Sequence, residues 1–360
     1  MSEKNNLTYI LNKFNRCLII KMTYNLSDLS IYRTQMMGIA TIMIIICHSC
    51  ASKVIMPDSL CYLFCFGNIG VDIFLFLSGI GLYYSLSRNN LNSKEDYMSF
   101  YKRRIYRIYI PYLMVFIPSC LVFMLLGEYS VCDSIFCLST LEYWLFHRGA
   151  WFVSLIVLLY LVAPFLYRAL IGKHRWIIAL GIIIALMILS NIPIEDQSST
   201  SVPYNIQSAF SRTPSFIVGL TIGPSCKEGE QLTVTKMAFF LFVSIFSSII
   251  LGFWKCLCLI VPILLYILTP LIRWSKGSWV DKSLHFLGKI SLESYLTNIT
   301  LNGILIVLIP AYITSPVFYG RYLEYSIVVV VGVLLAFIIN NAAQRVINKK
   351  LSCTHDPNMI

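Results

Sequence analysis

The chain has 360 residues, of which 58% are hydrophobic and only 12% charged, with a formal net charge of +11. Soluble domains carry about 25% charged residues, so this composition excludes an ordinary soluble protein and indicates one embedded in lipid. The lysines and arginines stand in short clusters between apolar runs, which argues against a nucleic-acid partner and is typical of the basic cytoplasmic loops of membrane proteins.

Ten apolar segments, each near the length of about 20 residues that a bilayer crossing requires, predict an all-α bundle of about ten transmembrane helices. Basic residues concentrate in alternate loops, which predicts a multi-pass protein of the plasma (inner) membrane with both termini in the cytoplasm. We expect a cytoplasmic N-terminal segment at 1–30, one transmembrane domain at 31–345 and a cytoplasmic tail at 346–360. The expected spans are 34–52, 66–86, 108–126, 151–168, 176–192, 209–224, 236–253, 256–272, 285–308 and 324–342.

The first span carries Arg33 at its cytoplasmic end and His48 toward its outer end, 15 residues later. At about 100° per residue the two side chains are about 60° apart around the helix axis, so they can line one passage through the bundle. A neutral imidazole can take and return a proton near neutral pH, which makes His48 a candidate base for activating a hydroxyl. A histidine that is merely hydrogen-bonded in the headgroup zone is the alternative.

The second span places Asp72 in its outer half, at a depth similar to that of His48. A carboxylate beside an imidazole can orient its tautomer and stabilise its protonated form, so we include Asp72 with His48 as a candidate catalytic residue. The alternative is that Asp72 caps its helix or pairs with an arginine.

A basic stretch precedes the third span and places Arg103, Arg104 and Arg107 at helical spacing on the membrane surface. Positive-inside anchoring accounts for such residues by itself. Arginine forks also bind phosphate, so these three residues and Arg33 are candidates for holding a nucleotide-bearing donor such as coenzyme A.

Further along, Trp151 opens the fourth span and Arg212 lies at the outer end of the sixth. Interfacial tryptophans are typical membrane anchors; we also assign Trp151 and Arg212 as candidate substrate-binding residues. Lys289 and Glu293 are four residues apart, the spacing of a local helical ion pair. We expect no metal site and no permanently bound cofactor, and a disulfide among outward-loop cysteines such as Cys61 and Cys65 stays open.

Six segments in order resemble the integral-membrane acyltransferase-3 family of carbohydrate O-acetyltransferases. They are the histidine-ended first span, GVDIFLFLSGIGLYYS, FYKRRIYRIYIP, WFVSLIVLLYLVAP, RTPSFIVGLTIG and LGKISLESYL. The resemblance implies that His48 is the family's essential histidine and that Arg104 and Arg107 are its cytoplasmic arginine pair. Two positions depart from the pattern: Met37 stands where the family often has an arginine, a charge that Arg33 one turn earlier can supply, and Asn298 where it commonly has a histidine.

The function that the resemblance implies is a membrane O-acyltransferase that moves acetyl from acetyl-CoA to a hydroxyl of a surface polysaccharide or its lipid-linked precursor. The expected partners are an acyl-CoA donor, a carbohydrate or lipid-linked glycan acceptor and the lipid bilayer, with no nucleic acid. Two schemes stay open: His48 deprotonates the acceptor, or His48 is itself acylated and relays the group. The competing function is a glycan exporter or small-molecule transporter without covalent chemistry.

Overall fold

The computed structural model describes residues 24–51, 54, 56–88, 93–196, 201–232, 257–308 and 320–352, and these segments are almost entirely helical. Two short strands, β1 (Tyr24–Asn25) and β2 (Gln231–Leu232), pair antiparallel. The helices are α2 (Asp28–Ile31), α3 (Arg33–Ala51), α4 (Asp58–Cys65), α5 (Ile69–Arg88), α6 (Lys94–Leu125), α7 (Val131–Leu138), α8 (Glu142–Phe146), α9 (Trp151–Leu170), α10 (Arg175–Leu189), α11 (Val202–Glu228), α13 (Leu257–Trp274), α14 (Trp279–Lys289), α15 (Ser291–Leu308) and α16 (Gly320–Ser352), with a 3-10 turn, η1 (Phe66–Asn68).

Four helical segments among the described residues are long and apolar enough to cross a bilayer, and the bent pair α14–α15 can supply a fifth. Their outer faces expose large apolar side chains such as Leu121 and Leu334, which are 57% and 60% exposed. These features identify a multi-pass membrane protein. Shorter apolar helices, Arg175–Leu189 and Ile260–Trp274, accompany the four long segments. The predicted count of ten spans is not established. The predicted span 236–253 lies outside the described residues. The four segments are Asp58–Arg88, Lys94–Leu125, Trp151–Leu170 and Leu323–Lys350.

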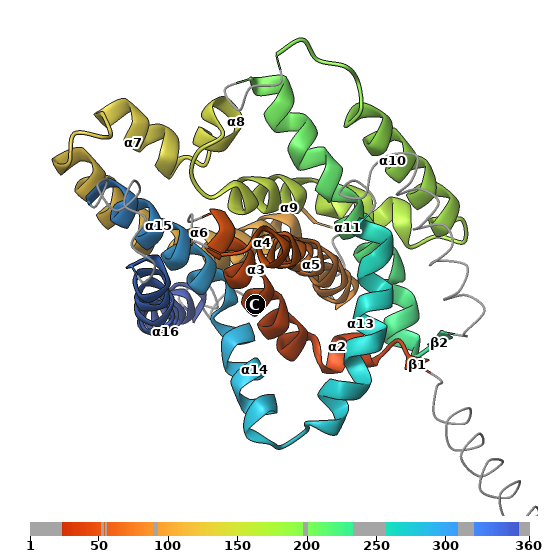
Figure 1. Cartoon of the computed structure of the whole chain (residues 1–360). Helices are drawn as coiled ribbons and strands as arrows, with labels where there is room; N and C mark the ends of the chain where they lie inside the picture. Colours follow the sequence, from red (N-terminus) through yellow and green to blue (C-terminus); the bar gives the residue numbers. More distant parts are fainter. Residues whose placement is uncertain are drawn as a thin grey trace, which may run out of the picture.

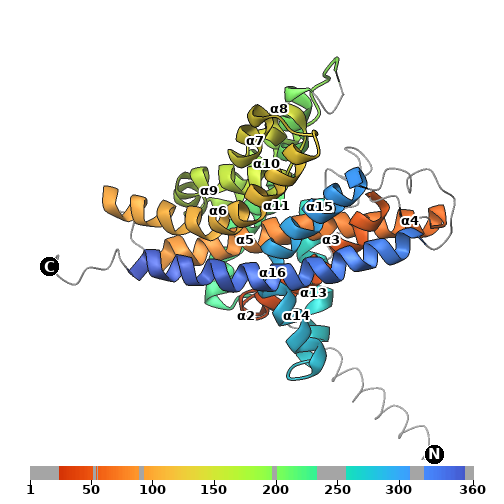
Figure 2. The same cartoon turned by 90° about the vertical axis from the view of Figure 1, so that its left-hand side faces the viewer.

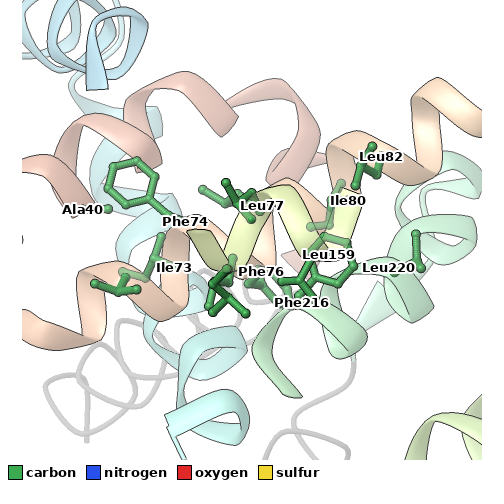
Figure 3. Close-up of a cluster of buried hydrophobic side chains, with 14 of the residues drawn as sticks. Ala40, Ile73, Phe74, Phe76, Leu77, Ile80, Leu82, Leu159, Phe216 and Leu220 are labelled. Atoms are coloured by element: carbon green, nitrogen blue, oxygen red, sulfur yellow. The ribbon is translucent and has the colours of Figure 1, made fainter. Parts of the chain in front are cut away.

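Helices α3 and α5 lie at the centre of the bundle, surrounded by the others (Figure 1). The long helices α5, α6 and α16 run in a similar direction (Figure 2), and α6 and α16 pack against each other. Helix α5 is apolar around almost its whole circumference, the pattern of a helix buried on all sides, and most of its residues are buried. Its side chains form a continuous apolar cluster with those of α3, α9 and α11 (Figure 3).

Glycines set the closest helix crossings. A Cβ atom built on Gly79 of α5 would overlap the Phe216 carbonyl oxygen of α11, and one on Gly219 of α11 would overlap the Phe76 carbonyl oxygen of α5. Small residues on both helices allow the backbones to touch, as is common between membrane helices. The position of α5 in the bundle therefore depends on these two residues lacking a side chain.

We expect Gly219→Ala to destabilise the protein by about 1–3 kcal/mol, because the added methyl group forces two backbones apart. Thermal unfolding of the purified protein in detergent would show this as a fall in Tm of several degrees. Gly181→Ala is the matched control, since a Cβ atom there meets no heavy atom within 4 Å. Equal Tm values for the two variants would contradict the crossing described here.

The apolar segment 285–308 is not a single straight helix. It divides at Ile290 into the end of α14 and the whole of α15, and the axes of these two helices differ by 70°. Helix α14 crosses α3 closely, since a Cβ atom on Gly288 would overlap the Thr34 carbonyl oxygen. The bend separates Lys289 from Glu293, and the ion pairs found among the described residues do not include this pair. The buried carboxylate of Glu293 instead accepts a hydrogen bond from Asn340 Nδ2 of α16 at 3.0 Å.

The connection between α6 and α9 carries the short helices α7 and α8, which lie at the edge of the molecule (Figure 1). Tyr112 of α6 fastens α7 by donating a hydrogen bond to the Cys137 carbonyl oxygen at 2.5 Å. Glu142 of α8 is buried and accepts a hydrogen bond from Tyr129 Oη at 2.7 Å. Burial raises the pKa of the Glu142 carboxyl above its ordinary value, so this connection is most stable where that carboxyl is protonated and loses stability as pH rises through its folded pKa.

Candidate active site

A cavity of about 710 Å³ lies between α3, α5, α6, α9, α15 and α16. Among its described lining residues, the cationic side chains far outnumber the anionic ones, of which Glu293 is the only example. Its volume is within the range of about 300–1,000 Å³ of small-molecule sites, and its charge favours a polyanionic ligand. The cations are Arg33, Arg88, Arg103, Arg104, Arg107 and Lys289.

Arg33 begins α3 and extends into this cavity across α5. Its Nε donates a hydrogen bond to the Leu77 carbonyl oxygen at 2.9 Å, and its guanidinium lies against Gly81, where a Cβ atom would be 2.9 Å from Nη2. This contact fixes the guanidinium while leaving further N–H donors for a ligand. Met37, one turn later on α3, lines the same cavity, so Arg33 supplies charge to the space that an arginine at position 37 would reach.

The basic stretch at the start of α6 forms another wall of the cavity, to which Arg103, Arg104 and Arg107 all contribute. The Arg104 guanidinium lies 5.7 Å from the centre of the Phe100 ring and 5.8 Å from that of the Tyr160 ring. Such cation–π contacts hold a planar guanidinium in a defined orientation. The four residues predicted to bind the donor therefore converge on one cavity, although they come from two separate helices.

His48 lies outside this cavity, beside a small pocket of about 10 Å³. The small pocket and the large cavity share lining residues, among them Phe74 and Tyr295. The His48 and Tyr295 rings are 6.3 Å apart between centroids. The imidazole therefore lines a pocket that adjoins the basic cavity, with Phe74 and Tyr295 lining both.

Asn298 of α15 holds the His48 ring, since its Oδ1 lies 3.2 Å from His48 Nδ1. In the tautomer with the proton on Nδ1, this contact is a hydrogen bond to the amide oxygen, and the lone pair of the neutral ring is on Nε2. From the sequence alone, Asn298 is only a departure from the pattern of the family that the chain resembles and has no expected role. The contact crosses 250 positions of sequence, and the departure itself was the signal that could have drawn attention to it.

Asp72 is buried and its two carboxylate oxygens are bound by residues of α11. Arg212 Nη1 lies 2.5 Å from one oxygen, and Ser215 Oγ donates to the other at 2.7 Å. Of the alternatives considered for Asp72, the structure shows pairing with an arginine, and that arginine is Arg212. Removing either charge would leave the other buried without its partner, a change that costs about 3–5 kcal/mol in proteins.

Trp151 begins α9 in a group of aromatic side chains contributed by α8, α9 and the start of α11. Its ring centroid is 6.3 Å from that of Tyr143. Tyr143 Oη donates to the Asn205 carbonyl oxygen at 3.0 Å, and His147 Nδ1 lies 2.6 Å from Asn205 Oδ1. This group joins α8 to α11, about two turns before Arg212. Trp151 does not itself line the basic cavity, but its ring contacts that of Phe152, which does.

Comparison with known proteins identifies one family. The sequence model of that family, described as an acyltransferase domain, matches residues 35–341. No curated protein and no solved structure matches the chain. The matched region includes His48, the arginines at the start of α6 and the bent helix pair that carries Asn298.

Proposed function

The chain belongs to the acyltransferase-3 family, and from that premise we propose that this membrane acyltransferase transfers acetyl from acetyl-CoA to a hydroxyl of a surface polysaccharide or its lipid-linked precursor. The observation that supports this proposal best is the cationic cavity beside His48. A coenzyme A donor brings several phosphate charges and a flexible thioester arm. The cavity offers arginine forks for the phosphates, and a histidine lies just beyond its wall.

In the proposed reaction His48 Nε2 removes the proton from an acceptor hydroxyl, and the oxygen attacks the thioester carbonyl carbon. The new C–O bond forms as the C–S bond breaks, and the departing thiolate takes the proton from the imidazolium. In this scheme Asn298 Oδ1 accepts a hydrogen bond from Nδ1–H, which keeps the lone pair on Nε2. In the alternative relay, the same Nε2 first accepts the acyl group and then passes it to the acceptor; a trapped acyl-histidine would distinguish this scheme.

The acceptor side of the proposal involves Trp151, Arg212 and Asp72. Trp151 offers an aromatic face, and Arg212 a cation whose orientation Asp72 fixes by a direct ion pair. We propose that Asp72 acts through Arg212, while Asn298 orients His48. The proposed topology retains ten spans with both termini in the cytoplasm. Lys102 of α6 and Lys350 of α16 both place their ammonium groups against the Tyr106 ring. The basic start of α6 and the basic end of α16 therefore lie at the same end of the bundle, which supports a C-terminus on the same side as the start of α6.

Acetyl-CoA binding by the purified protein in lipid nanodiscs is the experiment that tests this function. We expect saturable binding of acetyl-CoA and release of free coenzyme A when an acceptor glycan is supplied. Acetyl-pantetheine is the matched ligand, because it keeps the thioester and lacks the nucleotide phosphates that the arginines would hold. A glycan exporter would bind neither compound, and that result would exclude the acyltransferase mechanism proposed here.

Asn298→Leu should lower kcat for acyl transfer by roughly tenfold to a hundredfold, because the loss of a positioning hydrogen bond costs about 1–3 kcal/mol. Acetyl-CoA binding should be unchanged, since Asn298 does not line the basic cavity. Asn298→Asp keeps an acceptor oxygen for Nδ1–H and should recover much of the rate. Similar losses in the Leu and Asp variants would show that Asn298 serves the packing of α15 and does not position His48.

A further inference from the structure

Three cysteine sulfurs meet where the end of α3 packs against α4. The Sγ atoms of Cys50, Cys61 and Cys65 all lie within 4.8 Å of one another. Cys61 and Cys65 are four residues apart on α4, so their side chains lie on one face of that helix. All three are partly buried, and none forms a disulfide in this structure. The group therefore combines one thiol from α3 with two from α4.

A fourth sulfur completes the group. Met56, in the connection between the two helices, places its Sδ 3.9 Å from Cys50 Sγ. Sulfur ligands about 2.3 Å from a tetrahedral metal ion are about 3.8 Å apart from one another. The three thiols, all within 4.8 Å of one another, thus require only a small closure around an ion, and Met56 lies beside Cys50 as a candidate fourth ligand. Cys47 lies next to the group and directs its Sγ toward the Cys65 carbonyl oxygen at 3.7 Å.

We propose that Cys50, Cys61, Cys65 and Met56 form a binding site for a thiophilic metal ion, with Cu(I) preferred. Thiolate and thioether ligands select soft ions, whereas protein zinc sites are built from cysteine, histidine and carboxylate ligands. Binding releases the thiol protons and forms metal–sulfur bonds. The ion would fix α4 to the end of α3 through Cys50, which lies two residues after His48. It would thereby give the end of α3 that carries His48 a defined position.

The sequence alone led us to expect no metal site, and the pattern that bears on the proposed one is short. Cys47 and Cys50 are separated by two residues, a spacing common among metal ligands. The other two cysteines follow on the next helix, α4, and only the packing of α4 against the end of α3 brings them to Cys50. Periodicity within either helix alone does not reveal that contact.

The test uses the full chain, purified in detergent with its thiols reduced and titrated with Cu(I) against a chromophoric Cu(I) chelator. We expect one ion per chain, with ultraviolet absorption from thiolate-to-copper charge transfer. Cys50→Ser, Cys61→Ser and Cys65→Ser should each weaken binding at least about tenfold, and Met56→Leu should weaken it while all three thiols remain. Cys132→Ser is the matched control, since Cys132 is exposed and lies outside the group.

A second measurement separates metal binding from misfolding of a variant. Ions that bind only the folded state raise its stability, so Cu(I) should raise the Tm of the wild type and of Cys132→Ser but not that of Cys65→Ser. Equal Cu(I) affinity in the wild type and the three serine variants would overturn the proposal. A disulfide joining two of these cysteines in protein isolated from cells would also overturn it. Neither readout depends on acyl transfer.

Discussion

Replacing His48 by alanine is expected to lower acyl transfer by about a hundredfold to ten-thousandfold, the usual contribution of a general base. The binding of acetyl-CoA should be unchanged, because the imidazole lies beside the small pocket and the donor arginines line the large cavity. The measurement compares kcat for transfer to an acceptor glycan with the Kd for acetyl-CoA in the same preparation. A loss confined to kcat identifies a residue that acts on the reacting atoms.

His174→Ala is the matched control for this prediction. His174 is exposed at the start of α10 and does not line either pocket. It should retain wild-type transfer and wild-type Tm. If His48→Ala transferred acetyl at the wild-type rate, His48 would be neither the base nor the acyl carrier.

The second large effect is expected from the arginines of the cavity. Arg33→Met and Arg104→Met should each weaken acetyl-CoA binding by roughly tenfold to a hundredfold, since hydrogen bonds to charged groups contribute about 1.5–3 kcal/mol. The affinity for acetyl-pantetheine should change much less, because that compound lacks the nucleotide phosphates. Arg148→Met is the control, since this arginine is exposed on the connection between α8 and α9 and does not line the cavity.

The neighbouring Met37 offers a sharper form of this test. Arg33 and Met37 lie one turn apart on α3 and line the same cavity, so Met37→Arg in the Arg33→Met background moves the charge by one turn. We expect this exchange to recover part of the affinity for acetyl-CoA. No recovery, together with an unchanged Tm, would show that Arg33 acts through its hydrogen bond to the Leu77 carbonyl oxygen and not through its charge.

The sequence predicted most of the helices because apolar runs of bilayer length have few alternatives to the helix in lipid. The cores of α3, α5, α6, α9 and α16 coincide with expected spans. The helices extend beyond those spans where the chain becomes polar, as in α6, which begins at Lys94 with a Ser93 capping box. The break at Ile290 was not predicted. It follows the close crossing of α14 and α3, a contact between distant parts of the chain that no local pattern reveals.

The candidate site, like the fold, could be predicted from the sequence only in part. The arginines were predicted because their local spacing matches their chemistry, and the structure brings them to one cavity. The partners of the buried polar groups could not be predicted, because His48 meets Asn298 and Asp72 meets Arg212 across long stretches of sequence. Depth in the membrane made Asp72 a reasonable partner for His48. The rotation of each helix about its own axis decides which neighbour a side chain reaches, and this rotation cannot be inferred from the local sequence pattern.

The most direct test of the proposed function is the O-acetyl content of cell-surface glycans, measured by NMR in cells that lack this gene. The cells are complemented at matched expression with the wild type, His48→Ala or His174→Ala. We predict that the wild type and His174→Ala restore the acetyl signal and that His48→Ala does not. An acetyl content that is the same with and without the gene, while glycan export depends on it, would contradict O-acetylation as the function and support transport in its place.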